Sequence, residues 1–436
     1  MSDDRSVSAE LYERALGSLP GGVSRNTVLR RPHPFYADRA VGCRVVDVDG
    51  VERIDFANNM ASLIHGHAHP EIIRAVTEQL PKGTAFTLAT EVEIRFAEHL
   101  RSRNIGFERL RFVNSGTEAV MAALKTARAF TGRTMIAKVE GAYHGAYDFA
   151  EVSQTSNPSN WGGIDRPHKV PTAFGTPQSV LDDVVVLPFN DTDRALSLLD
   201  EHRGELACVL LDPMPHRVGL VPANKEFVSA LHDWTISNDS LFVMDEVITF
   251  RSEYGGAQTW YDVQPDLTAL GKIIGGGFPV GALAGRAEIM NVMNPFADSF
   301  VYPQSGTFSA NPITMTAGLV AMEMYDEAAV AEVNRLAKLA RTGIEEVIRS
   351  IGARACVSGG GSILRVHLKE APPQGYREAF PRPEESSRLA LLFDHLFEAG
   401  VMMINTCSAT ISTPMTEAEI GFLVAALESG LPMVAD

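Results

Sequence analysis

Six apolar-rich runs lie between residues 100 and 290, and segments of helical periodicity separate several of them. The runs are RLRFVN (109–114), MIAKVE (135–140), LACVLLDP (206–213), LFVMDEV (241–247), LTALG (267–271) and VGALAG (280–285). Helical segments include residues 115–132 and 225–238. A strand that is apolar along its whole length is buried on both faces. The pattern therefore predicts an α/β fold in which helices cover both faces of a mostly parallel sheet.

The two ends of the chain differ from this central pattern. Residues 9–19 have the period of an amphipathic helix, and the turn dipeptide Asp49-Gly50 between alternating segments predicts a hairpin. After residue 309 long helical segments dominate, and SILRVHL (362–368) is a further strand candidate. We predict an N-terminal segment that joins the smaller lobe (1–60), a large domain (61–315) and a smaller C-terminal α+β domain (316–436).

Composition excludes several classes of protein. The net charge of −16 argues against a surface for nucleic acid or for an anionic membrane. The four cysteines lack metal-site spacing, so we expect neither a metal nor a disulfide framework. The first 22 residues lack the apolar core of a signal peptide, and no apolar run approaches the ~20 residues of a membrane span. We expect a cytoplasmic protein.

Residues 151–187 form a long stretch that begins with little apolar periodicity and many turn residues. Such a stretch inside a compact domain is usually functional or mobile. Two interpretations stay open here: a lid over a site, or a surface insertion.

Asp245 and Glu246 follow the apolar run LFVM. Burying an unpaired carboxylate costs several kcal/mol, so at least one of the two needs a partner. Lys272 directly follows LTALG, and its neighbours Ile273 and Ile274 would desolvate the amine, which lowers its pKa and makes it a better nucleophile. Taken alone, Asp245 and Lys272 are each typical of a polar residue at the end of a strand. Together, Asp245 and Lys272 fit the acid and the Schiff-base lysine that pyridoxal phosphate requires.

A phosphate site and a ring contact complete this hypothesis. Ser115-Gly116-Thr117 separates a strand candidate from an amphipathic helix, whose N-terminus favours a phosphate, although the same tripeptide can be a plain helix cap. Tyr143 and His144 follow the strand candidate MIAKVE, where ligands of open α/β sheets bind.

The blocks NSGTEA, GAYHG, DEVITF, PDLTALGKIIGGGFPVGALAG and QSGTFSANPITMTAG resemble the class III, fold-type I, pyridoxal-phosphate-dependent aminotransferases. The resemblance is strongest to the branch with glutamate-1-semialdehyde 2,1-aminomutase and the β-amino-acid aminotransferases. It implies a seven-stranded, mostly parallel sheet flanked by helices, a smaller α+β lobe, and a homodimer with shared active sites.

The resemblance also implies roles for individual residues. Lys272 would carry the cofactor, Asp245 would face its ring nitrogen, and Ser115, Gly116 and Thr117 would hold its phosphate. Tyr143, His144 and Val247 would lie against the cofactor. Thr307 would reach the phosphate of the neighbouring subunit.

The chain departs from the family where the substrate is expected. DPMPHRVG (212–219) stands where the family often has EPxxGNMG, and the arginine that the β-amino-acid enzymes carry near PRGF is missing from INTCSATIS (404–412). The site at which that arginine would bind a substrate carboxylate is therefore missing from this chain or lies elsewhere in it. Arg25 lies where this branch brings an N-terminal arginine over the site, and Arg217 is a second candidate for a substrate carboxylate.

These observations predict a ping-pong aminotransferase that moves an amino group from an amino acid or amine, with β-amino acids and other non-α amines among the candidates, to a keto acid. The first rival is an aminomutase-type shift within one molecule. A protein of this fold that has lost catalysis and only binds a partner is a rival of another class, and the retained Lys272 and Asp245 argue against it.

Overall fold

The computed structural model describes residues 6–434, and its centre is a seven-stranded sheet. In sheet order the strands are β4 (Arg109–Val113), β10 (Gly281–Gly285), β9 (Leu267–Gly271), β8 (Leu241–Asp245), β7 (Leu206–Leu211), β5 (Met135–Val139) and β6 (Val184–Leu187). Only β10 is antiparallel to its neighbours, while β9, β8, β7, β5 and β6 run parallel. The prediction of a mostly parallel sheet is confirmed.

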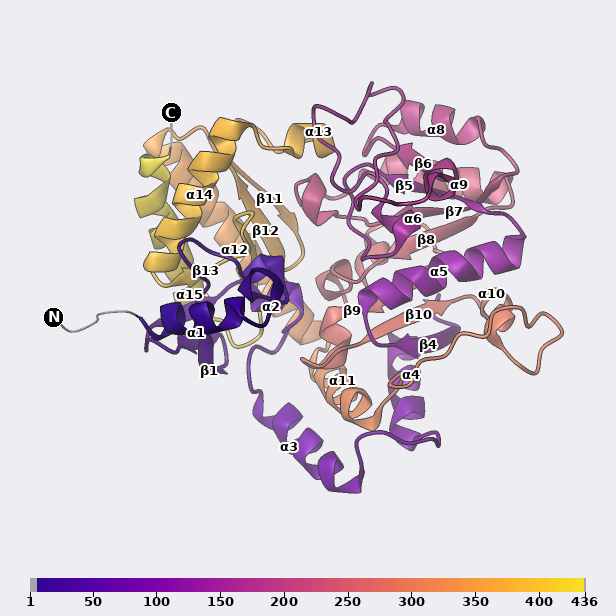
Figure 1. The fold of residues 1–436 in the computed structure, drawn as a ribbon, viewed down its shortest axis with the longest axis horizontal. Coiled ribbons are helices and arrows are strands. Elements are labelled where there is room, and N and C mark those ends of the chain that lie inside the picture. Colours follow the sequence, from indigo (N-terminus) through magenta and orange to yellow (C-terminus); the bar gives the residue numbers. More distant parts are fainter. Residues whose placement is uncertain (1–5, 435–436) are drawn as a thin grey trace.

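Helices cover both faces of this sheet (Figure 1). Along β8, Val243 packs in one apolar cluster with residues of helix α5, whereas Phe242 and Met244 pack in the opposite cluster with residues of α8 and α9. Since successive side chains of a strand point to opposite faces, this division explains why the strands are apolar throughout. The helices of the large domain are α3 (Pro70–Gln79), α4 (Glu91–Arg103), α5 (Gly116–Thr131), α6 (Asp148–Glu151), α7 (Gln178–Asp182), α8 (Thr192–Asp200), α9 (Lys225–Ser237) and α10 (Ala287–Met290).

All six predicted strands are present, and the sequence analysis missed the seventh. Strand β6 falls at the end of the 151–187 stretch, which also contains α7 and begins at the last residue of α6. Its apolar run is only four residues long and directly follows two aspartates, so its local pattern is weak. Pairing along β5 and burial of all four residues stabilise it instead.

The smaller lobe combines the two ends of the chain. A three-stranded antiparallel sheet of β11 (Cys356–Gly360), β12 (Ile363–His367) and β14 (Ser408–Thr410) packs against helices. The helices of this half of the chain are α11 (Pro312–Met324), α12 (Glu327–Ile351), α13 (Tyr376–Ala379), α14 (Pro383–Glu398) and α15 (Glu417–Gly430). The N-terminal segment contributes α1 (Val7–Leu16), α2 (Asn58–Ala61), β1 (Ala37–Val41), β2 (Arg44–Asp47) and β3 (Glu52–Asp55).

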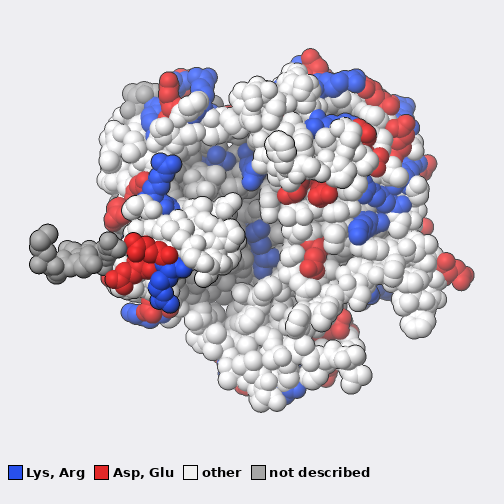
Figure 2. All heavy atoms as spheres, in the orientation of Figure 1, with Lys and Arg blue, Asp and Glu red and all other residues white. Residues whose placement is uncertain are grey.

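N-terminal strands extend into the C-terminal part through a mixed sheet. β2 and β3 form the predicted hairpin, and β13 (Val401–Met402) pairs parallel to β3. The division at residues 60 and 315 stays a prediction. Figure 2 shows a hollow between the smaller lobe on the left and the large domain on the right, with Lys and Arg atoms inside it. No helix within residues 6–434 is long and apolar enough to cross a membrane.

One fully buried arginine joins the two lobes. Arg251 follows β8, and each of its guanidinium nitrogens has an acceptor. Nε donates to Ser362 Oγ at 2.8 Å, one terminal nitrogen donates to Ala61 O at 3.2 Å, and the other donates to Ile411 O. One hydroxyl and two carbonyls from distant segments thus give each nitrogen of this buried guanidinium an acceptor.

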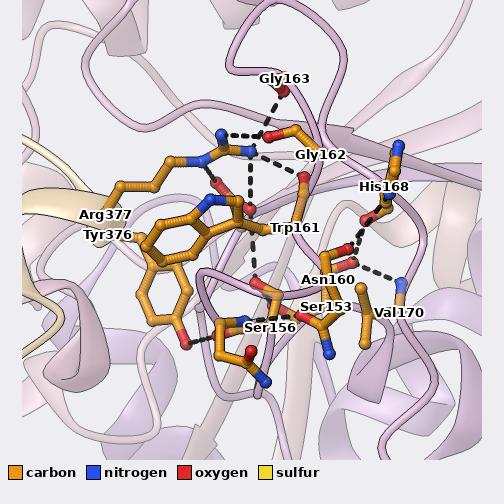
Figure 3. Close-up of polar contacts among 12 residues, drawn as sticks. Ser153, Ser156, Asn160, Trp161, Gly162, Gly163, His168, Val170, Tyr376 and Arg377 are labelled. Atoms are coloured by element: carbon orange, nitrogen blue, oxygen red, sulfur yellow. Dashed lines mark hydrogen bonds and ion pairs between the residues drawn. The ribbon is translucent and has the colours of Figure 1, made fainter.

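The 151–187 stretch is fastened to α13 (Figure 3). Arg377 Nε donates to Glu140 Oε2 at 2.8 Å, and its terminal nitrogens donate to the carbonyls of residues 161–163 at 2.8–3.2 Å. Its neighbour Tyr376 donates its hydroxyl to Ser156 O at 2.6 Å. The C-terminal half of the chain therefore determines the course of this stretch.

We predict that Arg377→Ala lowers the midpoint of thermal unfolding and speeds proteolysis between residues 151 and 187. The Glu140 side chain is 3% exposed, and removing one partner of a buried ion pair costs about 3–5 kcal/mol. Arg203→Ala is the matched control, because its pair with Asp200 is exposed and contributes little. Equal cleavage rates for the two variants would contradict this role of Arg377.

Candidate active site

A cavity of about 560 Å³ lies at the carboxyl ends of three adjacent strands. Asp212 directly follows β7, Asp245 ends β8, and Lys272 directly follows β9, and all three line the cavity. Parallel neighbours place their carboxyl ends at the same edge, so the strand order alone brings two acids and one amine together. The predicted proximity of Lys272 and Asp245 is thus part of the fold.

Asp245 is held by a histidine that the sequence analysis placed only beside Tyr143. Its Oδ2 lies 2.7 Å from His144 Nδ1, and its Oδ1 accepts from the Val247 amide at 3.0 Å. Both side chains are almost completely buried, and His144 Nε2 has no hydrogen-bond partner. Burial lowers the pKa of His144, although the hydrogen bond to Asp245 opposes this shift. The contact fixes the orientation of the carboxylate.

Lys272 presents an amine with a reduced pKa. Desolvation lowers the pKa of this amine, and the charges of Asp245 and Asp212 only partly offset the effect. Its backbone adopts a left-handed φ of +49°, which is uncommon for a residue with a side chain and is typical of functional sites. A larger neutral fraction makes the amine a better nucleophile at neutral pH.

Asp212 is the second carboxyl group of the cavity. It is buried beside Asp245, and burial together with that neighbouring negative charge raises its pKa well above the usual range. A raised pKa keeps the proton on Asp212 and so limits the negative charge beside Asp245.

Glu246 belongs to the structure around the site and does not line the cavity. It is fully buried and accepts from the amides of Ala257 (2.6 Å) and Gln258 (2.9 Å) and from Gln258 Nε2 (2.8 Å). Burial raises the pKa of Glu246 to about 7. Of the two carboxylates in LFVMDEV, Asp245 thus lines the cavity, and Glu246 binds the backbone of the following loop.

The N-terminus of α5 borders the same cavity. Ser115 caps the helix, because its Oγ accepts from the Glu118 amide at 3.1 Å. The first amides of a helix lack intrahelical partners and, with the helix dipole, attract anions. A Cβ on Gly116 would lie 2.7 Å from Cγ1 of Val247, so only glycine allows this close approach. Thr117 lines the cavity beside Gly116.

The other predicted residues are placed differently. Tyr143 lines the cavity and is 45% exposed, and the guanidinium carbon of Arg217 lies 5.6 Å from its ring centre. Arg217 itself is exposed and donates to Gln154 O. Thr307 is exposed and does not line the cavity, nor does any residue of 151–187. The two open interpretations of that stretch, lid and surface insertion, therefore stay open.

Arg25 reaches the cavity from the N-terminal segment, and one terminal nitrogen donates to Asn59 Oδ1 at 2.7 Å. Both residues also line a second cavity of about 530 Å³. The sequence analysis missed Asn59 and did not assign Asp212 to the site. The sequence feature that could have pointed to Asn59 is the Asn-Asn pair, which lies in a left-handed turn. For Asp212 it is the position of an aspartate at the end of a strand.

Comparisons with known proteins agree with this geometry. The family model for aminotransferase class III matches residues 27–416. A glutamate-1-semialdehyde 2,1-aminomutase from Methanothermobacter thermautotrophicus is 37% identical over 423 residues, which cover 97% of this chain and 95% of that protein.

Two solved structures are similar throughout. An omega-transaminase from Sphaerobacter thermophilus superposes with a TM-score of 0.96 at 46% identity and covers 99% of this chain and 98% of its own. A β-phenylalanine aminotransferase from Variovorax paradoxus has a TM-score of 0.87 at 30% identity, with coverages of 98% and 94%. The fold is therefore that of the fold-type I transferases, as predicted.

A solved transaminase with bound pyridoxal phosphate has a TM-score of 0.90 at 39% identity and covers 98% of this chain and 97% of its own, and the residues present here fit that cofactor. The cavity offers a desolvated amine for the aldehyde, a fixed carboxylate for the ring nitrogen, and a helix N-terminus for the phosphate. Within residues 6–434 no three His, Cys, Asp or Glu side chains lie close enough to hold a metal ion.

We predict that Gly116→Ala weakens pyridoxal phosphate binding. The added methyl group would overlap Val247, and such overpacking costs about 1–3 kcal/mol, which corresponds to about 5- to 150-fold in affinity. The measurement is a spectroscopic titration of the apoprotein. Gly163→Ala is the control, since a methyl group there meets no atom within 4 Å.

A double variant separates this clash from loss of the fold. Val247→Ala opens the space beside residue 116, so Gly116→Ala should weaken cofactor binding much less in that background than in the wild type. An equal loss of affinity in both backgrounds would show that the effect of Gly116→Ala does not come from overlap with Val247.

Proposed function

The chain belongs to the class-III aminotransferase family, and from that premise we propose that it transfers an amino group from an amino acid or amine to a keto acid. The observation that carries the proposal is the set of Lys272, Asp245 and the α5 N-terminus around one cavity. Its donors include β-amino acids and other non-α amines. The names of the two similar solved structures, an omega-transaminase and a β-phenylalanine aminotransferase, support this substrate range.

When bound, pyridoxal phosphate holds the amino group covalently and withdraws electrons from the substrate carbon. The neutral amine of Lys272 would take the proton from that carbon and deliver it to the aldehyde carbon of the cofactor, and the second half-reaction would move a proton in the opposite direction. Asp245, oriented by His144, stabilises a positive charge on the ring nitrogen. The first amides of α5, with Ser115, Gly116 and Thr117, bind the phosphate. Tyr143 and Val247 border the ring. All these roles are part of the proposal.

Transfer between two molecules requires release of the first product. Two features support this course: no residue of 151–187 lines the catalytic cavity, and a second cavity of about 530 Å³ shares Arg25, Asn59 and Gly277 with it. An intramolecular shift would require retention of the deaminated intermediate, and therefore a closed site.

The second candidate is that intramolecular shift. The 37% identity to a glutamate-1-semialdehyde 2,1-aminomutase supports it, because the relative spans nearly the whole chain. The stretch 212–219, DPMPHRVG, is bulkier than the family's usual EPxxGNMG, which favours the first candidate.

We also propose a homodimer in which Thr307 approaches the phosphate of the partner's cofactor. The surrounding segment carries exposed apolar side chains, namely Phe296 (97%), Val301 (62%) and Phe308 (59%). Exposed apolar groups gathered in one segment are typical of an interaction surface.

One experiment distinguishes the two candidates. The holoenzyme is supplied with β-phenylalanine or a simple amine together with pyruvate or 2-oxoglutarate, and separately with glutamate-1-semialdehyde without a keto acid. We expect amino transfer in the first assay and no sustained formation of 5-aminolevulinate in the second, with Lys272→Ala as the blank. Repeated turnover only in the second assay would establish the aminomutase instead.

Arg25 is proposed to bind a substrate carboxylate, so Arg25→Ala should discriminate between donors. Loss of a charge-assisted, bidentate contact should lower kcat/KM for carboxylated donors. The corresponding loss of transition-state stabilisation should be on the order of 2–4 kcal/mol. A matched amine without the carboxylate should be affected little. Arg39→Ala is the control, because Arg39 is exposed and forms an exposed ion pair with Asp38. Equal losses for both donors would mean that Arg25 only shapes its loop.

A further inference from the structure

The one-turn helix α2 (Asn58–Ala61) is left-handed. Its four φ angles are +45°, +46°, +60° and +69°, and the ψ angles of Asn59 and Met60 are 56° and 48°. L-residues disfavour this conformation, and only Gly, Asn and Asp adopt it routinely, as single residues. Residues held in such a conformation cluster at functional sites. The strain in α2 therefore points to a function for a side chain that this turn presents.

Contacts from three parts of the chain hold α2 in place. Asp55 Oδ1 accepts from the Asn58 amide at 2.8 Å, and Asn58 Nδ2 donates to Thr410 O of the smaller lobe at 2.7 Å. At the other end of the turn, Arg251 of the large domain donates to Ala61 O at 3.2 Å. These contacts fix both ends of α2 without using the side chain of Asn59.

The side chain of Asn59 lies at the border of two cavities. Asn59 and Arg25 line both the catalytic cavity and the second cavity, and Ser62 lines the catalytic cavity. Asn59 Nδ2 donates to Ser62 Oγ at 3.2 Å, while Ser62 Oγ donates to Asn59 O at 2.8 Å. Ser62 therefore orients the amide, whose nitrogen faces the serine. The amide oxygen faces Arg25 and lies 2.7 Å from a terminal guanidinium nitrogen.

This partner of Arg25 carries no charge. Among residues 6–434 no carboxylate forms an ion pair with Arg25. Arg30 lines the second cavity and pairs with Asp394 at 2.7 Å. The charge of Arg30 is thus compensated within the chain, whereas the charge of Arg25 is not. A guanidinium has five N–H donors, so the bond to Asn59 leaves donors available for a carboxylate.

We propose that Asn59 is a positioning residue for substrate selection: its amide oxygen holds Arg25 at the border of the catalytic cavity and, being uncharged, leaves the guanidinium charge for a substrate carboxylate. This inference deepens the proposed function and rests on the binding of a substrate carboxylate by Arg25. The left-handed turn serves to place the amide oxygen at this border. Asn59→Asp would keep nearly the same shape but compensate the charge of Arg25, so donors with a carboxylate would lose their advantage.

The first test compares 3-phenylpropanoate with 3-phenylpropanamide, which has nearly the same shape without the charge. Both ligands are titrated calorimetrically into the holoenzyme. We expect the wild type to bind the carboxylate more tightly than the amide. Asn59→Asp should weaken the carboxylate about tenfold or more and leave the affinity for the amide unchanged.

Asn59→Gly tests the orientation of Arg25 separately from its charge. The variant removes the amide oxygen and relieves the left-handed backbone, because glycine adopts a positive φ without steric cost. We expect 3-phenylpropanoate to bind about threefold more weakly or worse, with no fall in the midpoint of thermal unfolding. Asp239→Gly is the matched control, since Asp239 is also exposed, has a φ of +49° and precedes the amino end of β8, at the edge of the sheet opposite the cavity. It should leave the affinity for both ligands unchanged.

A double-mutant cycle shows whether Asn59 acts through Arg25. In the Arg25→Ala background, Asn59→Gly should change the affinity for 3-phenylpropanoate by less than about twofold. An equal loss in both backgrounds would overturn the proposal. A lower unfolding midpoint in Asn59→Gly, together with equal weakening of both ligands, would overturn it as well, because that result is expected of a residue that only supports the fold.

Kinetics provide a second readout. In Asn59→Asp the kcat/KM for β-phenylalanine should fall about tenfold or more. The kcat/KM for 1-phenylethylamine, which is the same donor without the carboxylate, should change little. Equal losses for the two donors would contradict a role of Asn59 in selecting the carboxylate.

The outcomes for the two proposals are distinguishable. If Arg25→Ala leaves the affinity for 3-phenylpropanoate unchanged, the proposed role of Arg25 and this inference are both wrong. If Arg25→Ala weakens that ligand and the Asn59 variants do not, only this inference is wrong. If binding follows the expected pattern but no amino transfer occurs, the role of Asn59 stands and the proposed reaction is wrong.

Discussion

Burial of both faces of the central sheet is the constraint on which the site depends. Strand residues pack alternately against α5 on one side and against α8 and α9 on the other, so polar side chains are excluded from most of each strand. The chemistry is therefore concentrated where strands end. Three neighbouring parallel strands end in a polar residue or are directly followed by one, namely Asp212, Asp245 and Lys272. Parallel pairing brings these three side chains to the same edge of the sheet.

Desolvation then determines how these groups behave. It lowers the pKa of Lys272 and raises that of Asp212, and both shifts reduce the charge that the cavity must hold. His144 and the Val247 amide fix the two carboxylate oxygens of Asp245 in place. One fixed carboxylate among partly neutralised neighbours is suited to stabilising a positive charge on a bound ring.

The walls of the hollow come from segments that are distant in sequence. Arg25 and Asn59 belong to the N-terminal segment, which is attached to the smaller lobe by the pairing of β3 with β13. Arg251 and Arg377 join the lobes through backbone carbonyls. The position of the proposed substrate residue Arg25 therefore depends on how the two lobes are held together, while the proposed cofactor residues Lys272, Asp245 and Gly116 line the cavity at the edge of the central sheet.

The sequence by itself determined the strands, the mostly parallel sheet and the Lys272–Asp245 pair, because continuous apolar runs and strand-end polar residues are local signals. It missed β6, whose four residues depend on pairing with β5. It also missed Asn59 in the wall of the cavity, because an Asn-Asn pair has no local feature that marks it as part of a site. Only the tertiary structure placed the Asn59 side chain against Arg25, 34 residues away in the chain, since the packing of the N-terminal segment over the cavity is set by contacts that no local pattern encodes.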